Sequence, residues 1–163
     1  MTVTQEAKPY ALSREEGEPL WLLGGLITLK ATGESTDGQL TLMEALAPPG
    51  FAVPLHTHER EHEAFYVLEG EMTFYLDEDA IQASEGAFFS VPPGTPHGFE
   101  VRSESRFLDL RTPGGFEGFF RAAGEPAQAR TLPPSAPPDV AKLVDAAPRF
   151  GMTILAPPPA EDN

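Results

Sequence analysis

The sequence predicts an all-β domain with one or two short helices near its C-terminus. The chain has 163 residues, enough for one domain that buries its own core, and 40% of them are hydrophobic. Its 18 prolines and 15 glycines gather at the joints between apolar segments and near the C-terminus. Many short strand-forming runs separated by such rigid turns are typical of a β-barrel or β-sandwich, and not of a helical bundle.

The first third of the chain is expected to contain a lead-in and then strands. Residues 1–18 form a loosely held N-terminal lead-in in this interpretation. From Pro19 to Ala31 the chain is apolar and rich in strand formers, with a bend or bulge at Gly24-Gly25. A loop of small and polar residues follows, and residues 39–47 are the next expected strand.

Residues 64–76 are expected to form a β-hairpin. Two strand-forming runs, residues 65–68 and 72–76, flank Glu69-Gly70, where glycine tolerates the positive φ of a tight turn. Further short strands are expected around residues 80–83, 87–91, 98–102 and 106–111. Because several runs are apolar on both faces, one face should line the interior. The other should be covered by a second sheet, the helices or a partner subunit.

Helical periodicity begins only after Pro113-Gly114. Four residues share one helix face, which is expected to pack against the barrel: Phe116, Phe119, Phe120 and Ala123. Residues 126–138 are a Pro- and Ala-rich linker. Asp139 is then expected to cap a second short helix that buries Val140, Leu143 and Val144.

Charge and composition exclude several classes of partner. The formal net charge is −14, so the surface repels phosphate backbones and anionic lipids, and we expect neither nucleic acid nor membrane as a partner. The absence of cysteine excludes disulfides and thiolate metal sites. Residues 1–21 lack the basic start and apolar run of a signal peptide, and no apolar run is long enough to span a bilayer. We therefore expect a cytoplasmic protein.

Three of the four histidines and several carboxylates lie within residues 56–63. Side chains two apart share a face of a strand, so His56 and His58 can point together into the interior. Glu63 begins the next strand beside them, and His97 follows the rigid loop 91–96. Three imidazoles and one carboxylate suit one divalent transition metal (Fe, Mn, Ni, Co, Cu or Zn) and leave a position for water, substrate or dioxygen.

The spacing of these residues is more specific than their type. Residues 50–70 contain G-x5-H-x-H-x4-E-x6-G, and residues 86–101 contain G-x5-P-x-G-x2-H, fifteen residues later. These motifs resemble the two signature motifs of the cupin superfamily. The resemblance implies a single antiparallel β-barrel of jelly-roll type at residues 19–111, with a C-terminal extension of helices and Pro-rich segments at 112–163. It places the metal ligands at His56, His58, Glu63 and His97.

One position departs from the cupin pattern, and three nearby residues stay outside the ligand set. Val101 occupies the place where the second motif usually ends in Asn, so we expect altered packing or pocket polarity but no loss of metal. Strand alternation turns His62 away from the metal, toward solvent or an interface. Glu59 and Glu61 are expected on the loop surface, although Glu61 remains open as an outer-shell partner of the metal site.

The same strand parity predicts the substrate pocket. If Glu63 and His97 point inward, so do four apolar neighbours: Phe65, Val67, Phe99 and Val101. An apolar, aromatic-lined pocket favours a flat or hydrophobic small molecule over a sugar phosphate. The alternative is that these side chains only fill a narrow barrel.

The similarity to bacterial quercetin 2,3-dioxygenase-like cupins covers more of the chain than the two motifs: residues 17–25, 63–70, 124–127, 132–134 and 157–159. This resemblance implies an oxygenase that opens the ring of a flavonol with dioxygen and releases carbon monoxide. Glu63 would be the catalytic residue, both a metal ligand and the acceptor of the substrate hydroxyl proton.

Two other functions remain open. One is a non-redox isomerase or lyase acting on a small hydroxy or enol substrate. The other is a non-catalytic cupin that binds a metabolite or metal. A homodimer through the outer sheet is expected unless the C-terminal helices cover that surface.

Overall fold

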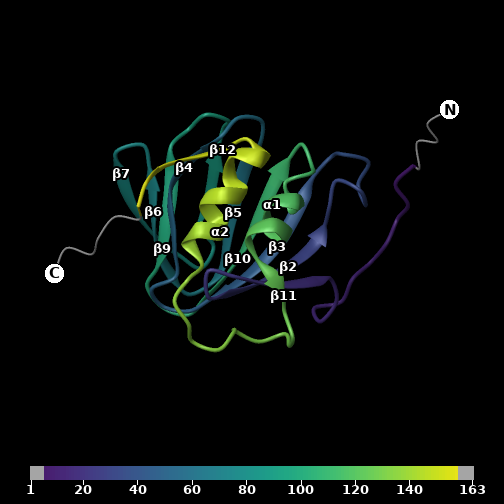
Figure 1. Cartoon of the computed structure of the whole chain (residues 1–163), viewed down its shortest axis with the longest axis horizontal. Coiled ribbons are helices and arrows are strands. Elements are labelled where there is room, and N and C mark those ends of the chain that lie inside the picture. Colours follow the sequence, from purple (N-terminus) through teal and green to yellow (C-terminus); the bar gives the residue numbers. More distant parts are fainter. Residues whose placement is uncertain (1–5, 158–163) are drawn as a thin grey trace.

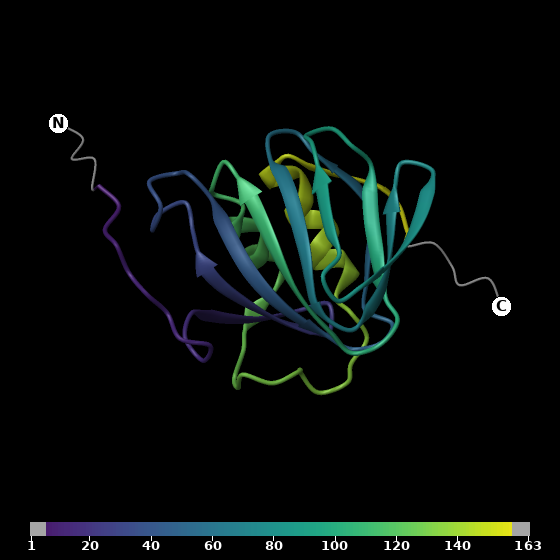
Figure 2. The same ribbon diagram turned by 180° about the vertical axis from the view of Figure 1, so that it is seen from behind.

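The structure is a computed structural model that describes residues 6–157. It consists of two facing β-sheets with a helical layer on one side (Figures 1 and 2). Residues 1–5 of the predicted lead-in and residues 158–163 of the predicted C-terminal extension lie outside the described residues. No helix in the described part of the chain is long and apolar enough to cross a membrane.

The first sheet has seven strands in the order β11-β1-β2-β3-β10-β5-β8. Their bounds are β1 Glu18–Leu22, β2 Gly25–Ala31, β3 Thr41–Ala47, β5 His62–Glu69, β8 Phe88–Val91, β10 Ser105–Thr112 and β11 Glu125–Pro126. The second sheet has five strands in the order β12-β4-β9-β6-β7. Their bounds are β4 Ala52–His58, β6 Glu71–Leu76, β7 Asp79–Ser84, β9 His97–Val101 and β12 Met152–Ala156.

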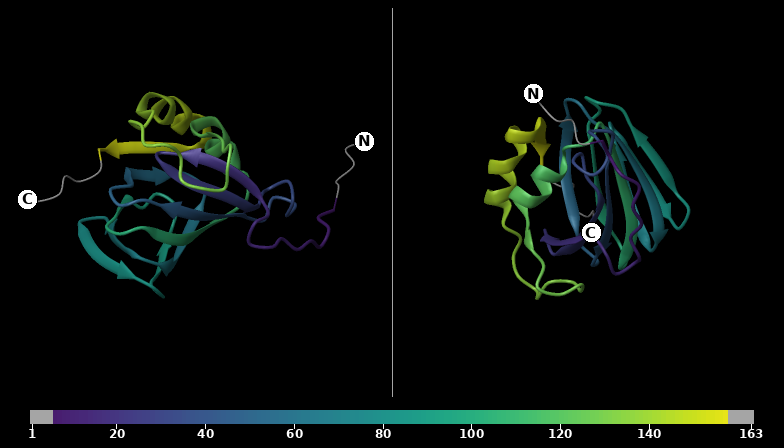
Figure 3. Two further views of the ribbon diagram at one scale, coloured as in Figure 1. Left: turned by 90° about the horizontal axis from the view of Figure 1, so that it is seen from below. Right: turned by 90° about the vertical axis from the view of Figure 1, so that its right-hand side faces the viewer.

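The mainly antiparallel β architecture agrees with the sequence prediction, but the single closed barrel does not. The two sheets are hydrogen-bonded separately and face each other across the core (Figure 3). Aromatic side chains from both sheets fill the space between them; the Phe65 and Phe74 rings, for example, lie 4.8 Å apart. The interior is therefore that of a sandwich of two sheets.

The predicted hairpin at residues 64–76 is wrong in its pairing. β5 pairs with β10 and β8, whereas β6 pairs with β7 and β9 in the other sheet. Gly70, with φ of 94°, turns the chain from one sheet to the other. Both flanking strands carry large aromatic residues on one face, and burying these faces against each other across the core removes more apolar surface than edge pairing would.

The C-terminal segment adds helices and one strand to the sandwich. α1 Glu117–Ala123, α2 Val140–Ala146 and the 3₁₀ helix η1 Ala147–Phe150 lie along one side of the sheets (Figure 3, right). α1 buries its phenylalanine stripe, as predicted. Asp139 caps α2 by accepting a hydrogen bond from the Lys142 backbone N–H at 3.0 Å. β12 then pairs with β4, the strand that carries His56 and His58.

One packing prediction for α2 is wrong. Leu143 is buried, but Val140 and Val144 are 54% and 53% exposed. The helix has only seven residues and contacts the rest of the molecule along a single face, so the two valines remain on the outer side.

Candidate metal centre

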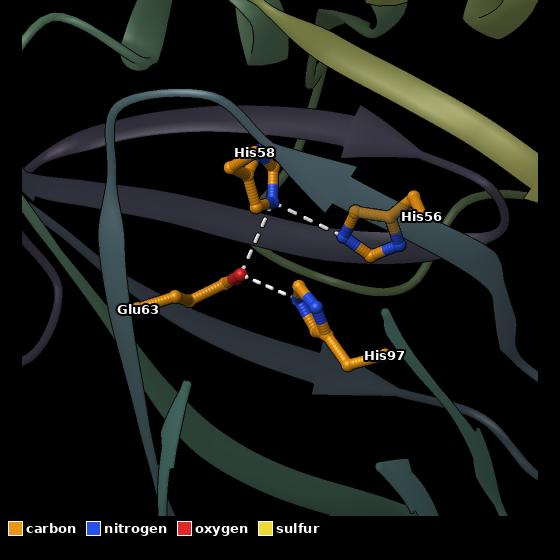
Figure 4. A group of neighbouring side chains, drawn as sticks. All are labelled: His56, His58, Glu63 and His97. Atoms are coloured by element: carbon orange, nitrogen blue, oxygen red, sulfur yellow. Dashed lines mark hydrogen bonds and ion pairs between the residues drawn. The ribbon is translucent and has the colours of Figure 1, made fainter. Parts of the chain in front are cut away.

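The four predicted ligands converge between the two sheets (Figure 4). β4 supplies His56 and His58, β9 supplies His97, and β5 of the opposite sheet supplies Glu63. The Nε2 atoms of His56 and His58 lie 3.1 Å apart. Glu63 Oε2 lies 3.1 Å from His58 Nε2 and 2.7 Å from His97 Nε2. All four side chains are buried, and their ligand atoms lie within 4.8 Å of one another.

Strand register brings residues far apart in sequence to this point. Alternate burial along β4 turns His56 and His58 inward, as the His-x-His spacing predicts. His56 is the direct partner of His97 in the β4–β9 ladder. Gly98 allows this close approach, because a Cβ at that position would lie 2.8 Å from the backbone oxygen of Val53. The register of β4 against β9 therefore fixes the spacing of His56 and His97.

Backbone carbonyls set the tautomers of two imidazoles. His56 Nδ1 donates to the Pro54 carbonyl at 2.7 Å, and His97 Nδ1 donates to the Thr95 carbonyl at 2.9 Å. These hydrogen bonds leave the Nε2 atoms of both rings facing the centre of the site. Burial lowers the pKa of His56 to about 3 and also lowers the pKa of His58, so both rings are neutral near pH 7.

This arrangement fits a divalent metal ion. Ligand atoms bonded to one ion at about 2.1 Å and at right angles lie about 3 Å apart. The three neighbouring ligand-atom distances, from 2.7 to 3.1 Å, match that separation. Three imidazole nitrogens and one carboxylate also suit transition metals by donor type.

Sequence reasoning missed a buried arginine beside the site. Arg111 on β10 donates to Glu63 Oε1 at 2.5 Å and to Asp109 Oδ2 at 2.9 Å. Its guanidinium also lies 4.0 Å from the centre of the Phe116 ring. A signal was present in the sequence, because Asp109 and Arg111 fall on the same face of β10 as the core residue Phe107. Two charges at inward positions of an otherwise apolar strand indicate a buried ion pair.

Arg111 lies between two carboxylates whose pKa values are displaced in opposite directions. Burial opposes ionisation of Glu63, but Arg111 and hydrogen bonds from His58 and His97 hold the pKa of Glu63 well below its ordinary value. Burial and the nearby negative charge of Glu63 raise the pKa of Asp109 well above its ordinary value. Near pH 7, Glu63 is therefore a carboxylate with Oε1 held by Arg111 and Oε2 facing the three imidazoles.

The remaining acidic and histidine residues of the first motif are divided between surface and interior. Glu59 and His62 are exposed, and His62 Nε2 lies 2.7 Å from Ser90 Oγ, outside the ligand cluster as predicted. The prediction that Glu61 lies on the loop surface is wrong, because its side chain is only 5% exposed. Its negative charge is among those that raise the pKa of Arg111, so it belongs to the charge environment of the site.

The predicted pocket residues all lie in the core, but only one contacts a cavity at the site. Phe99 lines a cavity of about 50 Å³ together with His56, Glu63 and Arg111. The other three are enclosed by the core: Phe65, Val67 and Val101. A substrate-contacting role for these four residues remains a prediction.

Known proteins with the same pattern define the class. Residues 43–110 match the family described as Cupin domain. The fold also matches a solved RmlC-like cupin from Shewanella frigidimarina, with a TM-score of 0.59 and 18% identity, over 70% of this chain and 98% of that one. The chain is therefore a protein of the cupin superfamily.

Within that class, the chain is similar to quercetin 2,3-dioxygenase from Bacillus subtilis. It is 36% identical to that protein over 128 residues, which are 78% of this chain and 38% of the relative. The chain thus spans well under half the length of this relative. The polyketide cyclase RemF from Streptomyces resistomycificus has a similar structure, with a TM-score of 0.55 and 25% identity, covering 64% of this chain and 79% of RemF.

Proposed function

We propose that His56, His58, Glu63 and His97 hold one divalent transition metal ion and that the protein is a dioxygenase. The proposed substrate is a flavonol-like or other enolic or aromatic small molecule. The observation that carries this proposal is the convergence of four buried ligand atoms between the sheets, beside a cavity that His56 and Glu63 line together with phenylalanine side chains. The similarity to a quercetin 2,3-dioxygenase supports the oxygenase class, although this chain spans only 38% of that relative.

The residues around the proposed metal have distinct roles in this scheme. A bound divalent ion would supply Lewis acidity toward a substrate hydroxyl and, if it is redox-active, access to dioxygen chemistry. Arg111 holds Oε1 of Glu63, which leaves Oε2 to face the ion. Glu63 is also proposed to accept the substrate hydroxyl proton. Its low pKa makes it a weak base, so this second role needs a test that separates it from ligation.

A non-redox reaction at the same centre is the second candidate. The structural similarity to RemF, a polyketide cyclase, favours it, because cyclisation is a reaction type different from dioxygen insertion. In that case the metal would act only as a Lewis acid on a small hydroxy or enol substrate. Activity without oxygen and with zinc in the site would distinguish this candidate from the dioxygenase.

The proposed function predicts metal-dependent oxygen uptake. Protein loaded separately with Fe, Mn, Ni, Co or Cu should consume oxygen with quercetin or a small enolic or catecholic substrate. Glu63→Gln should lower the rate per bound metal by about 100-fold or more if Glu63 accepts the proton. An oxygen electrode and metal analysis of the same samples measure both quantities.

The control for this experiment is Glu59→Gln, which changes an exposed carboxylate of the same motif. An unchanged rate per metal in Glu63→Gln would restrict Glu63 to ligation. Absence of uptake with every metal, together with conversion of substrate under argon, would replace the dioxygenase with the non-redox candidate.

We also propose a homodimer through the outer face of the seven-stranded sheet. Tyr66 on β5 and Phe88 on β8 are register partners and are 45% and 63% exposed. Adjacent exposed aromatic side chains on a sheet face support an association surface. A Tyr66→Ser, Phe88→Ser double variant should be monomeric by light scattering; a wild-type protein that is already monomeric would contradict the proposal.

The cytoplasmic location remains a prediction of the sequence.

A further inference from the structure

The cavity at the metal centre is too small for the substrates that the proposed function names. Its volume is about 50 Å³, whereas sites for drug-sized ligands generally measure about 300–1,000 Å³. A bicyclic or tricyclic aromatic molecule cannot enter this cavity unless side chains move. The substrate therefore needs a second space that communicates with the centre.

Such a space lies directly outside this cavity. A groove of about 850 Å³ runs between the β3–β4 turn, the linker at residues 132–138, α2 and β12. The elements that border it lie together on one side of the molecule in Figure 1. Val140, Val144 and Leu155 lie along it and are each more than half exposed. The helix face for which the sequence predicts burial thus borders this groove.

The lining of the groove disfavours charged ligands. None of the described residues that line it is Asp, Glu, Lys, Arg or His, although the whole chain carries a formal net charge of −14. Proline and aliphatic side chains dominate, and Ser135 supplies the polar side chain. Burying the apolar area of this surface against a ligand lowers the free energy of binding. An ionised ligand would lose its hydration there without gaining a charged partner. Its chemistry therefore fits a neutral, largely apolar molecule.

Three side chains separate the groove from the metal centre. Leu23, Phe51 and Leu143 line both spaces and come from three different parts of the chain. Leu23 has a φ of 52°, in the left-handed region that leucine rarely adopts. Together with Gly24, which also has a positive φ, Leu23 forms the two-residue turn between β1 and β2, and this turn holds its side chain at the boundary.

We propose that the groove is the binding site for a neutral, apolar small molecule, and that Leu23, Phe51 and Leu143 form a partition through which it reaches the metal centre. The statement that this ligand is the substrate rests on the proposed function. The binding itself does not, because every groove residue lies outside the ligand set.

Flavone tests the binding site directly, because it is neutral and planar and lacks the 3-hydroxyl group that could bind a metal. It should bind metal-free and metal-loaded protein with similar affinity. Ala52→Trp and, on the exposed linker, Ala136→Trp place an indole in the groove and should weaken binding by about tenfold or more. Ala80→Trp, at an exposed position on β7 away from the groove, is the matched control and should bind as wild type does.

Wild-type affinity in both groove variants would overturn the proposal. So would flavone affinity that falls as protein concentration rises, because a second copy of the chain would then occupy the groove. Circular dichroism of each variant establishes that its fold is intact. Failure of oxygen uptake with flavone binding retained would reject the proposed function and leave the binding site standing.

A neutral planar chelator tests the partition. 1,10-Phenanthroline should remove cobalt from the loaded protein by way of the groove, so Leu143→Ala should accelerate removal several-fold and Ala52→Trp should slow it. Ala80→Trp should leave the rate unchanged. Equal rates in all four proteins would show that the chelator enters elsewhere and would overturn the partition.

Discussion

Replacing His58 with alanine is expected to lower the affinity for a divalent metal by about 100-fold or more. His58 Nε2 lies 3.1 Å from both His56 Nε2 and Glu63 Oε2, so it belongs to the same set of ligand atoms. Loss of one of four protein ligands removes a metal–nitrogen bond that water replaces without the preorganisation of the buried site. Isothermal titration of metal-free protein with cobalt measures the change. His56→Ala and His97→Ala should behave alike.

His62→Ala is the matched control, because His62 lies one residue from Glu63 but is exposed and bonded to Ser90. It should bind cobalt as tightly as wild type. Each of the four variants should keep the far-ultraviolet circular dichroism of a β protein, which separates loss of metal binding from loss of the fold. Stoichiometric, tight cobalt binding in all three ligand variants would contradict the assignment.

The ligand set could be predicted because it depends on local parity and spacing. His56 and His58 face inward because alternate residues share a face of β4, and no long-range information is needed for that step. His97 and Glu63 required the resemblance to cupin motifs, since neither strand order nor register is encoded locally. The structure brings them together through the His56–His97 register and the approach of β5 from the opposite sheet.

The pairing of the strands could not be predicted from the sequence. Glu69-Gly70 has the composition of a hairpin turn, yet β5 and β6 lie in different sheets. A turn sequence specifies positive φ at Gly70 but not whether the strands meet edge to edge or face to face. The decision depends on the aromatic residues of both strands, which pack across the core.

The C-terminal strand was missed for a related reason. Residues 152–156 are short, follow a helix and have a proline after them, so local pattern gives little reason to expect a strand. β12 exists because β4 offers an unpaired edge, to which Met152 and Ile154 pair opposite His58 and His56. An edge strand that depends on its neighbour cannot be identified from its own residues.

Arg111 carries the largest expected effect on stability. Its guanidinium is buried between Glu63 and Asp109, and it is the cation that lowers the pKa of the Glu63 carboxyl. Arg111→Met keeps the length and apolar contacts of the side chain but leaves the carboxylate of Glu63 without its counter-charge. Removing one partner of a buried ion pair costs about 3–5 kcal/mol. Urea unfolding of metal-free protein should show a loss of this size.

Arg106→Met is the matched control, because Arg106 on the same strand pairs with Glu44 and Glu69 near the surface. Exposed pairs of this kind contribute about 1 kcal/mol or less, so this variant should be nearly as stable as wild type. The double variant Arg111→Met, Glu63→Gln removes both charges and should recover much of the lost stability. Equal effects of Arg111→Met and Arg106→Met would mean that Glu63 does not need Arg111 as its counter-charge.

The metal ion should itself compensate for the loss of Arg111. A divalent cation bound to Oε2 of Glu63 would supply positive charge on the side opposite the guanidinium, so the effect of Arg111→Met should shrink when cobalt is bound. The midpoints of urea unfolding, measured for wild type and variant with and without cobalt, give the size of this coupling. A smaller difference in the presence of cobalt would mean that Arg111 and the ion stabilise the same carboxylate. An unchanged difference would mean that Glu63 is not a ligand, even if the three imidazoles are.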